Sequence, residues 1–408
     1  MKQVAALVST YSSDEFGICS ALYELGGMVV MHDASGCNST YTTHDEPRWY
    51  DMDSMIYISA ISEMEAIMGD DDKLIGDITE TAAELHPKFI AVVGAPIPYM
   101  IGTDFAAIAE ILEHNTGVPC FGMEANGMCH YTKGVSMALE EIIDRFSKER
   151  DGRGRSSGDG GSASSVGRAG RPRVNIIGAT PLDFSVNGSV ESMREWLGQS
   201  GFEPGASIAM GCTLDDIVHA GDADLNLVVS YGGLAAARIL EKRFGIPYVA
   251  GVPAGREFAE YLADKLREAL ASGKSSTGYM DVSAETGETG DGNGWIGAVG
   301  ESVYQASVAA AAAMEQGVAI KVLCPLDTDD SLVRPCDMLT PEEDDIMQAV
   351  RADGCRGFMA DPMYRPLCPE GVEFYELPHE AFSGRIYDSV NPNLINRQLA
   401  ESLYDFRK

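Results

Sequence analysis

The chain has 408 residues, of which 45% are hydrophobic, and a formal net charge of −32 at pH 7. This length exceeds one core of ordinary size, so we expect two or three domains. The acidic charge disfavours nucleic acid and anionic membranes as partners, because phosphates are bound through Lys and Arg. No apolar run is long enough to span a bilayer, and the N-terminus makes a poor signal peptide. We therefore expect a cytoplasmic protein.

The first part of the chain alternates apolar strands with segments of helical periodicity, which predicts a parallel, doubly wound α/β sheet. The expected strands are Val4–Val8, Met28–Met31, Phe89–Val93 and one that begins at Cys120. The expected helices are Gly17–Leu25, Ile61–Met68, Asp77–Leu85 and Phe105–His114. Ser62 and Glu65 have the spacing of a capping box before the second of these helices. The acidic run Asp70–Asp72 after it suits a loop that meets a basic partner.

Residues 147–173 break this alternation, because they are rich in Gly, Ser and Arg and almost free of apolar residues. Such a segment cannot bury enough surface to order itself, so we interpret it as a linker. Strands and helices resume after it, and Thr213 is well placed to cap a helix over Thr213–Val218. The tail Leu394–Phe406 has the pattern of an amphipathic helix.

An internal echo supports repeated units. The first unit reads FIAVVGAP and later ILEHNTGVP, and the second reads LNLVVSYGG and later ILEKRFGIP. Two such matches in register favour repeated Rossmann-like domains. The predicted organisation is a first Rossmann-like domain (1–146), the linker (147–173), a second such domain (174–274), a loop (275–293) and a third such domain (294–408) whose C-terminal helix returns to the first.

Cys19 and Cys37 are the foremost candidates for metal ligands. The chain has nine cysteines, an odd number without any CxxC spacing, which argues against a disulfide framework. Cys37 follows Gly36 at the exit of the expected strand Met28–Met31, where ligands bind in open α/β sheets. Cys19 follows Gly17, and glycine allows a bulky cluster to approach closely. Plain burial as small hydrophobic residues is the alternative for both thiols.

The polar run from Thr42 to Trp49 lies directly after Cys37. His44 is the natural proton donor in this run, because an imidazole titrates near neutral pH, so we expect it to have a catalytic role. The alternative is a capped surface loop in which Asp45 and Glu46 pair with Arg48. Cys120, Cys129 and His130 are weaker ligand candidates, and the remaining cysteines are expected to be structural.

Taken together, these residues resemble the nitrogenase component 1 family. This family includes nitrogenase iron–molybdenum protein subunits, scaffolds for cofactor assembly and reductases of tetrapyrrole biosynthesis. The resemblance covers most of the chain and rests on Cys19 and on the segments HDASGC, ISEMEAIMGDDDKLIGDI, FIAVVGAP, MIGTDF and LPHEAFSGR. It implies three Rossmann-like domains with parallel sheets around a cofactor cleft.

The resemblance further implies a [4Fe-4S] cluster at a subunit interface, with Gly36, Cys19 and Cys37 as its binding residues in this chain. The implied partners are an identical or homologous component 1 subunit and an ATP-dependent iron protein that supplies electrons. The family usually carries a third cysteine after the strand Phe89–Val93, where this chain reads Gly94–Pro96. Two cysteines per chain suffice if two chains each supply two, and a non-cysteine ligand is the other option.

Three functions are compatible with the sequence. The first is a subunit of a nitrogenase-like reductase that passes electrons through the cluster to a substrate in the interdomain cleft, with a second metal or a tetrapyrrole as a conceivable further cofactor. The second is a non-catalytic scaffold that builds or holds a metal cofactor. The third is a cluster-free protein that binds a small ligand. The sequence does not name the substrate.

Overall fold

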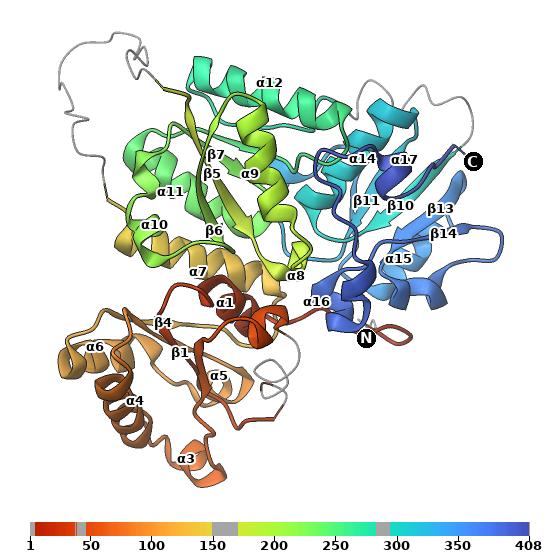
Figure 1. The fold of residues 1–408 in the computed structure, drawn as a ribbon. Coiled ribbons are helices and arrows are strands. Elements are labelled where there is room, and N and C mark those ends of the chain that lie inside the picture. The colour runs from red at the N-terminus through yellow and green to blue at the C-terminus, as the bar shows by residue number, and fades with distance from the viewer. Residues whose placement is uncertain (1–4, 37, 39–45, 149–169, 283–293, 408) are drawn as a thin grey trace.

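The computed structural model of the chain describes residues 5–36, 38, 46–148, 170–282 and 294–407. Three parallel sheets organise it, one after another along the chain. In Figure 1 the first unit lies below the second, and the third lies beside the second. This architecture confirms the predicted α/β fold with parallel sheets. None of the described helices is long and apolar enough to cross a membrane.

The first unit contains a four-stranded sheet of order β2-β1-β3-β4. Its strands are β1 (Met28–Met31), β2 (Met55–Ile58), β3 (Ile90–Val93) and β4 (Cys120–Met123). Its helices are α1 (Asp14–Leu22), α3 (Glu63–Met68), α4 (Asp72–Leu85), α5 (Pro96–Ile101), α6 (Phe105–Thr116) and α7 (Tyr131–Phe146). Both faces of the sheet are buried, since Val29 and Met31 enter the main core whereas Met28 and Val30 face a second apolar cluster with α4 and α6.

The second unit contains a five-stranded sheet of order β6-β5-β7-β8-β9. Its strands are β5 (Arg173–Ala179), β6 (Glu203–Ala209), β7 (Leu225–Val228), β8 (Tyr248–Ala250) and β9 (Ser276–Thr277). Its helices are α8 (Pro181–Phe184), α9 (Ser189–Gln199), α10 (Leu214–Val218), α11 (Leu234–Phe244) and α12 (Glu257–Ser272). The sequence did not predict β6, whose Pro204 and Gly205 resemble a loop. Gly205 is needed there, because a Cβ would lie 2.5 Å from the Asn175 Oδ1 atom on β5.

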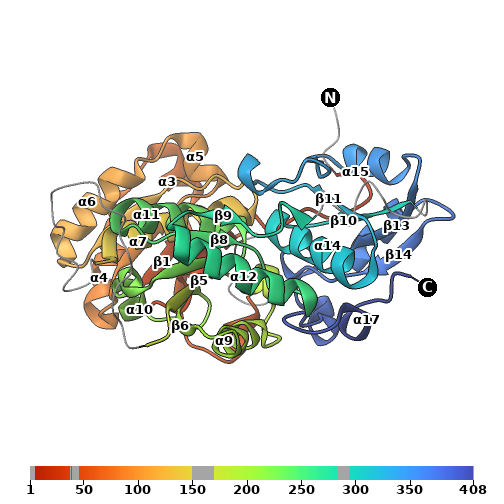
Figure 2. The same ribbon diagram turned by 90° about the horizontal axis from the view of Figure 1, so that it is seen from above.

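The third unit contains a five-stranded sheet of order β12-β11-β10-β13-β14. Its strands are β10 (Trp295–Val299), β11 (Ile320–Cys324), β12 (Met338–Leu339), β13 (Cys355–Ala360) and β14 (Glu373–Glu376). Its helices are α14 (Ser302–Gln316), α15 (Glu343–Val350), α16 (Glu380–Ser383) and α17 (Leu399–Ser402). Seen from above, this unit lies beside the second, with α12 packed against α14 between them (Figure 2).

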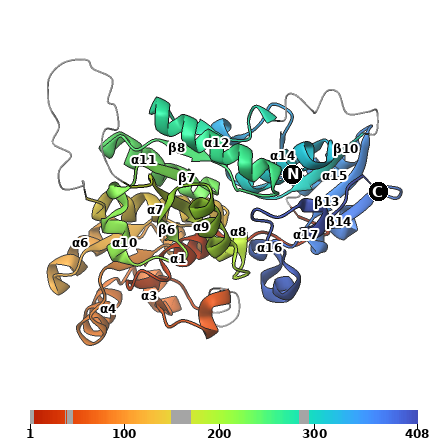
Figure 3. The ribbon, with the colours of Figure 1, turned by 45° about the horizontal axis from the view of Figure 1, so that its top comes forward.

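Helix α7 joins the first unit to the second. It packs against α1 on one side and against α10 and α11 on the other, and Figure 3 shows it between the two units. Helices α1 and α7 approach each other closely because Gly17 of α1 lies against the α7 backbone. A Cβ on Gly17 would lie 2.0 Å from the Tyr131 carbonyl oxygen. The space beside Gly17 is therefore filled by α7, which corrects the expectation that this glycine makes room for a cluster.

Both chain ends differ from the expected pattern. The predicted strand Val4–Val8 is wrong for its described part, where the backbone bends around a carboxylate. The N–H groups of Ala6, Leu7 and Val8 donate to Glu343 Oε2 at 2.8, 2.9 and 3.1 Å. The predicted tail helix over Leu394–Phe406 is also wrong, since only the short α17 forms. The tail contacts α14 through bonds from Leu399 N to Glu315 and from Phe406 N to Gln316.

Candidate functional site

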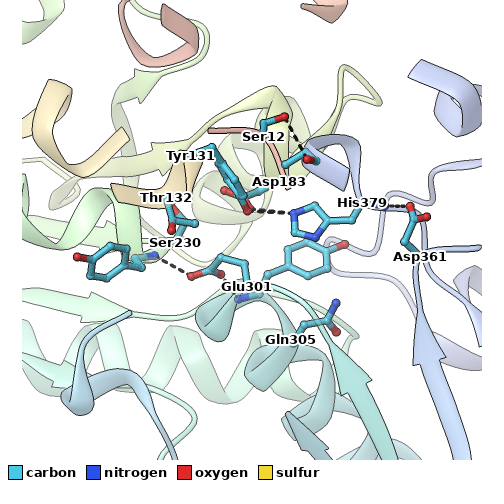
Figure 4. Close-up of polar contacts among 12 residues, drawn as sticks. Ser12, Tyr131, Thr132, Asp183, Ser230, Glu301, Gln305, Asp361 and His379 are labelled. Carbon is cyan, nitrogen blue, oxygen red and sulfur yellow. Dashed lines mark hydrogen bonds and ion pairs between the residues drawn. The ribbon is translucent and has the colours of Figure 1, made fainter. Parts of the chain in front are cut away.

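The carboxyl ends of the central strands in the second and third units face one another. In the second sheet, β5 lies between β6, the next strand in the chain, and β7, a later one; in the third sheet, β10 lies in the same way between β11 and β13. The strand order therefore reverses at β5 and at β10, and α/β proteins bind ligands at such topological switch points. Polar residues follow these strands directly. Figure 4 shows their meeting point, and we call Tyr131, Asp183, Glu301, Asp361 and His379 the junction cluster.

The centre of the junction cluster joins all three units. Tyr131 begins α7, Asp183 lies on α8 and His379 precedes α16. The Tyr131 hydroxyl donates to Asp183 Oδ1 and lies 3.0 Å from His379 Nε2. His379 Nε2 is also 3.4 Å from Asp183 Oδ1. All three side chains are buried, and burial raises the pKa of Tyr131 well above its ordinary value.

Asp361 fixes the backbone from which the His379 ring projects. Its Oδ2 atom accepts the His379 N–H at 2.9 Å and the Ser383 hydroxyl at 2.6 Å. Its Oδ1 atom accepts the Met363 N–H at 2.9 Å. Asp361 directly follows β13, so a core strand of the third sheet positions the imidazole.

Glu301 connects the third unit to the second. It caps α14 by accepting the Tyr304 N–H at 2.8 Å, and it accepts the Tyr231 N–H at 2.9 Å. Burial, together with the nearby Asp183 carboxylate, raises the pKa of Glu301 to about 7. This group therefore titrates near neutral pH inside the protein, where a buried acid can act as a proton donor.

Two buried polar atoms near the junction cluster make no hydrogen bond within the described residues. They are Thr180 Oγ1, at the end of β5, and Gln305 Oε1, one helical turn after Glu301. Buried polar atoms are normally paired, so unpaired ones suggest a functional requirement or a bound molecule. Together with an imidazole, a phenol and three carboxylates, these atoms give the junction groups that are suited to holding and moving protons.

Cys19 lies on α1 and is fully buried. Burial and the nearby carboxylates of Glu15 and Glu46 raise the pKa of this thiol well above its ordinary value. Gly36 is exposed, with open space where a Cβ would be. Cys37 and His44 lie outside the described residues, so their predicted roles stay predictions.

Arg48 is buried and belongs to a network of ion pairs and hydrogen bonds; it does not lie in a surface loop. Its guanidinium binds Glu46 Oε1 at 2.7 Å, Glu24 Oε1 at 2.8 Å and the Ser20 carbonyl oxygen at 2.8 Å. Glu24 also accepts the Gly211 N–H at 2.7 Å from the second unit. The network contacts α1 through Ser20, the residue after Cys19, and it fixes the position of Glu46.

The weaker ligand candidates make other contacts. The Cys120 thiol donates to the Val118 carbonyl oxygen, the Cys129 carbonyl oxygen accepts the Asp14 N–H at the start of α1, and His130 pairs with Asp327 of the third unit. Every cysteine in the described part of the chain is a free thiol. Within that part, no three His, Cys, Asp or Glu side chains form a ready-made metal site.

Sequence reasoning missed the junction cluster. The available signal was position: Asp361 directly follows β13, and Glu301 comes two residues after β10. His379 belongs to the segment LPHEAFSGR, which carried the family resemblance but received no role. The contacts between units that bring these residues together have no signature in the sequence.

Comparison with known proteins agrees with this architecture. Residues 21–286, more than half of the chain, match the family of nitrogenase component 1 type oxidoreductases. The nitrogenase iron–molybdenum cofactor biosynthesis protein NifE of Clostridium pasteurianum is 27% identical over 46% of this chain and 38% of its own length. A light-independent protochlorophyllide reductase subunit of Nostoc punctiforme is 26% identical over 46% of this chain and 36% of its own. The matched part thus spans less than half of either relative.

The fold is also similar to a solved nitrogenase structure. The structure titled "Nitrogenase Cp1 at pH 5" superposes with a TM-score of 0.62 at 14% identity, covering 97% of this chain and 88% of the other. At this identity the likeness establishes the fold alone. Together with the family match, it leads to one conclusion: the chain belongs to the nitrogenase component 1 type oxidoreductase family.

Proposed function

We propose that the chain is an electron-accepting subunit of a nitrogenase-like reductase. Electrons from an ATP-dependent iron protein enter an iron–sulfur cluster held by Cys19 and Cys37 and continue to a substrate at the junction between the units. The observation that carries the proposal is the environment of Cys19, a buried thiol beside two buried carboxylates in a chain of this redox family.

The described residues around Cys19 fit a cationic metal group. A thiolate at this position would be buried beside Glu46, which is paired with Arg48, and beside Glu15, whose pKa burial and Asp14 raise to about 8. A buried anion beside other anions is unstable unless a positive charge is bound. An iron–sulfur cluster supplies that charge, keeps its thiol ligands deprotonated and accepts one electron at a time.

A cluster with four iron atoms needs more ligands than one chain of this type offers. Cys19 and Cys37 provide two thiolates, so a second component 1 subunit, identical or homologous, completes the set. We infer that the cluster lies where two such subunits meet. Whether a further metal or tetrapyrrole also enters the junction depends on the substrate.

The junction cluster supplies the protons that a reduction consumes. Burial raises the pKa of Glu301 to about 7, and the Tyr131 hydroxyl connects the His379 imidazole to Asp183. Proton transfer from a positioned side chain requires hydrogen-bond distances of this kind. The predicted role of His44 as proton donor stands beside this one, since His44 lies outside the described residues.

Anaerobic reconstitution with iron and sulfide tests the proposal. The full chain is expected to acquire a brown chromophore that dithionite bleaches, and both Cys19→Ser and Cys37→Ser are expected to lose most of it. Cys336→Ser is the matched control, because Cys336 is exposed in the third unit. A colourless wild type, or an unchanged chromophore in Cys37→Ser, would contradict the proposal.

The similarity to NifE favours a second candidate, a scaffold on which a metal cofactor is assembled. This function needs the cluster and the junction but no turnover. The two candidates are distinguished by mixing the reconstituted protein with a reduced iron protein and ATP. A reductase reoxidises the iron protein repeatedly once substrate is present, whereas a scaffold takes up electrons at most once per cluster.

A further inference from the structure

The first described residues of the chain, 5–13, connect the third unit to the first, and we call them the strap. The strap contains no helix, and its only strand-like contact is an isolated bridge between Ser13 and His130. Figure 1 shows it passing α16 on its way to α1. Among its residues only Tyr11 is buried, whereas Ser9 and Thr10 are exposed. The strap is therefore a thin cover with solvent on its outer side.

One end of the strap is held by a single carboxylate. Glu343, in the first turn of α15, accepts the N–H groups of Ala6, Leu7 and Val8 at 2.8, 2.9 and 3.1 Å, all at its Oε2 atom. Burial by itself would raise the pKa of this carboxyl, but the three donors lower it below its ordinary value. Because hydrogen bonds to a charged acceptor are strong, Glu343 is the main attachment of this end.

The other end of the strap covers the junction cluster. The Tyr11 ring lies 5.2 Å from the His379 ring and 6.4 Å from the Tyr131 ring, measured between ring centroids. Ser12 donates its N–H and its hydroxyl to the Ala381 carbonyl oxygen at 2.8 and 3.1 Å, and Figure 4 shows it beside the cluster. Tyr11 therefore lies between the His379 ring and the outer side of the strap.

Between its two attachments the strap does not pack tightly on the third unit. A cavity of about 40 Å³, large enough for water, lies beneath Val8 and Ser9. Pro325 and Pro341, which come after β11 and β12, line its opposite side. The strap thus crosses the carboxyl ends of strands in the third sheet, where α/β proteins bind ligands. A segment with so little buried surface is of the kind that opens locally.

We propose that the strap is a lid over the junction cluster and that Glu343 is its latch. Release of the three N–H groups from Glu343 moves Tyr11 away from His379 and opens the cluster to a small molecule, and rebinding closes it. This inference rests on the proposed function, because it takes the junction cluster as the place where a substrate is reduced. The closed lid excludes water from the proton-carrying groups during the reaction.

Glu343→Ala tests the latch in the full chain. Diethyl pyrocarbonate modifies accessible imidazoles and therefore probes the cover over His379, which is 8% exposed. We expect the variant to accelerate modification of His379 by about tenfold or more, because the strap loses its charged acceptor. Asp344→Ala is the matched control, since it removes an exposed acid from the same helical turn. The exposed His219 is the internal reference, and its rate should stay unchanged.

Hydrogen exchange of the wild type covers the case in which Glu343→Ala fails to fold. The amides of Ala6–Val8 and of Ser12 are expected to exchange in one opening step, about tenfold or more faster than those of β10. An unchanged rate at His379 in Glu343→Ala, an equal rise in Asp344→Ala, or strap amides as slow as those of β10 would overturn the lid. These measurements need no iron, so a chain that binds no iron overturns the proposed function separately.

Discussion

The Tyr131 hydroxyl lies 3.0 Å from His379 Nε2, although 248 positions separate the two residues in the chain. Through Asp183, which accepts the same hydroxyl, this contact joins the first, second and third units. The geometry of this single buried network therefore depends on the relative positions of all three sheets. Changes in this network should affect both stability and chemistry.

Tyr131→Phe is expected to lower the free energy of unfolding by about 1–3 kcal/mol, because it leaves Asp183 and His379 buried without a shared partner. Denaturant unfolding followed by circular dichroism measures this change. Tyr99→Phe removes a hydroxyl from an exposed side chain and should have little effect. Equal stability of the two variants would show that the Tyr131 network contributes no net free energy.

Glu301 should make stability depend on pH in a defined window. Its folded-state pKa is raised from 4.5 to about 7, so the folded protein holds a proton that the unfolded chain releases between these values. Glu301 therefore contributes its full stabilisation to the free energy of unfolding below pH 4.5. This contribution falls as pH rises toward 7, by at most about 1.4 kcal/mol per pH unit for one proton.

The variant that tests this dependence is Glu301→Gln. It is expected to flatten the decline of the unfolding midpoint between pH 5 and about 7, whatever its effect on absolute stability. Glu203→Gln, at an exposed position on β6, should keep the wild-type slope. If the slopes of all three proteins coincide, Glu301 is not the titrating group.

The buried Arg48 network is expected to be sensitive to truncation. Arg48→Ala leaves Glu46 and Glu24 without their cation and should cost about 3–5 kcal/mol, whereas Arg48→Lys keeps a charge but not the forked geometry and should cost less. Unfolding of the two variants in parallel measures the difference. A loss below about 1 kcal/mol in Arg48→Ala would mean that the pairs behave as surface ion pairs do.

Strands and helices with strong local signals were predictable from the sequence. Strands such as Met28–Met31 are continuous apolar runs, and the capping box of Ser62 and Glu65 forms as its spacing predicts. Local signals failed where a distant residue decides the structure. The segment at Ala6–Val8 bends around Glu343, a carboxylate from the third unit, and β6 depends on the fit of Gly205 against β5.

The sites were less predictable than the sheets. Cys19 stood out as a chemistry-bearing residue, but no local pattern singles out its neighbour Glu15, because an acid in the first helical turn is ordinary. Burial and the missing partner of one oxygen distinguish it. Similarly, the junction cluster forms only when the three units pack together, because its residues Tyr131, Asp183 and His379 come from different units.

Helix α3 is expected to form part of a docking surface for the iron protein. It has no buried residue, and its Met64, Ile67 and Met68 side chains are exposed, Met68 by 72%. It packs next to α5 at the end of the first unit that is remote from the other two (Figure 1), with the acidic run Asp70–Asp72 at its edge. An exposed apolar patch with an acidic rim suits a partner whose contact surface is apolar and basic.

Met68→Glu tests this docking surface, because it places a charge at the most exposed apolar side chain of α3. The variant should leave the thermal unfolding midpoint unchanged but abolish complex formation with an iron protein in the presence of ATP, as measured by sedimentation velocity. Val186→Glu, at an exposed apolar position in the second unit, controls for the added charge. Binding that survives in Met68→Glu would exclude α3 from the contact, whereas loss in both variants would point to general charge repulsion.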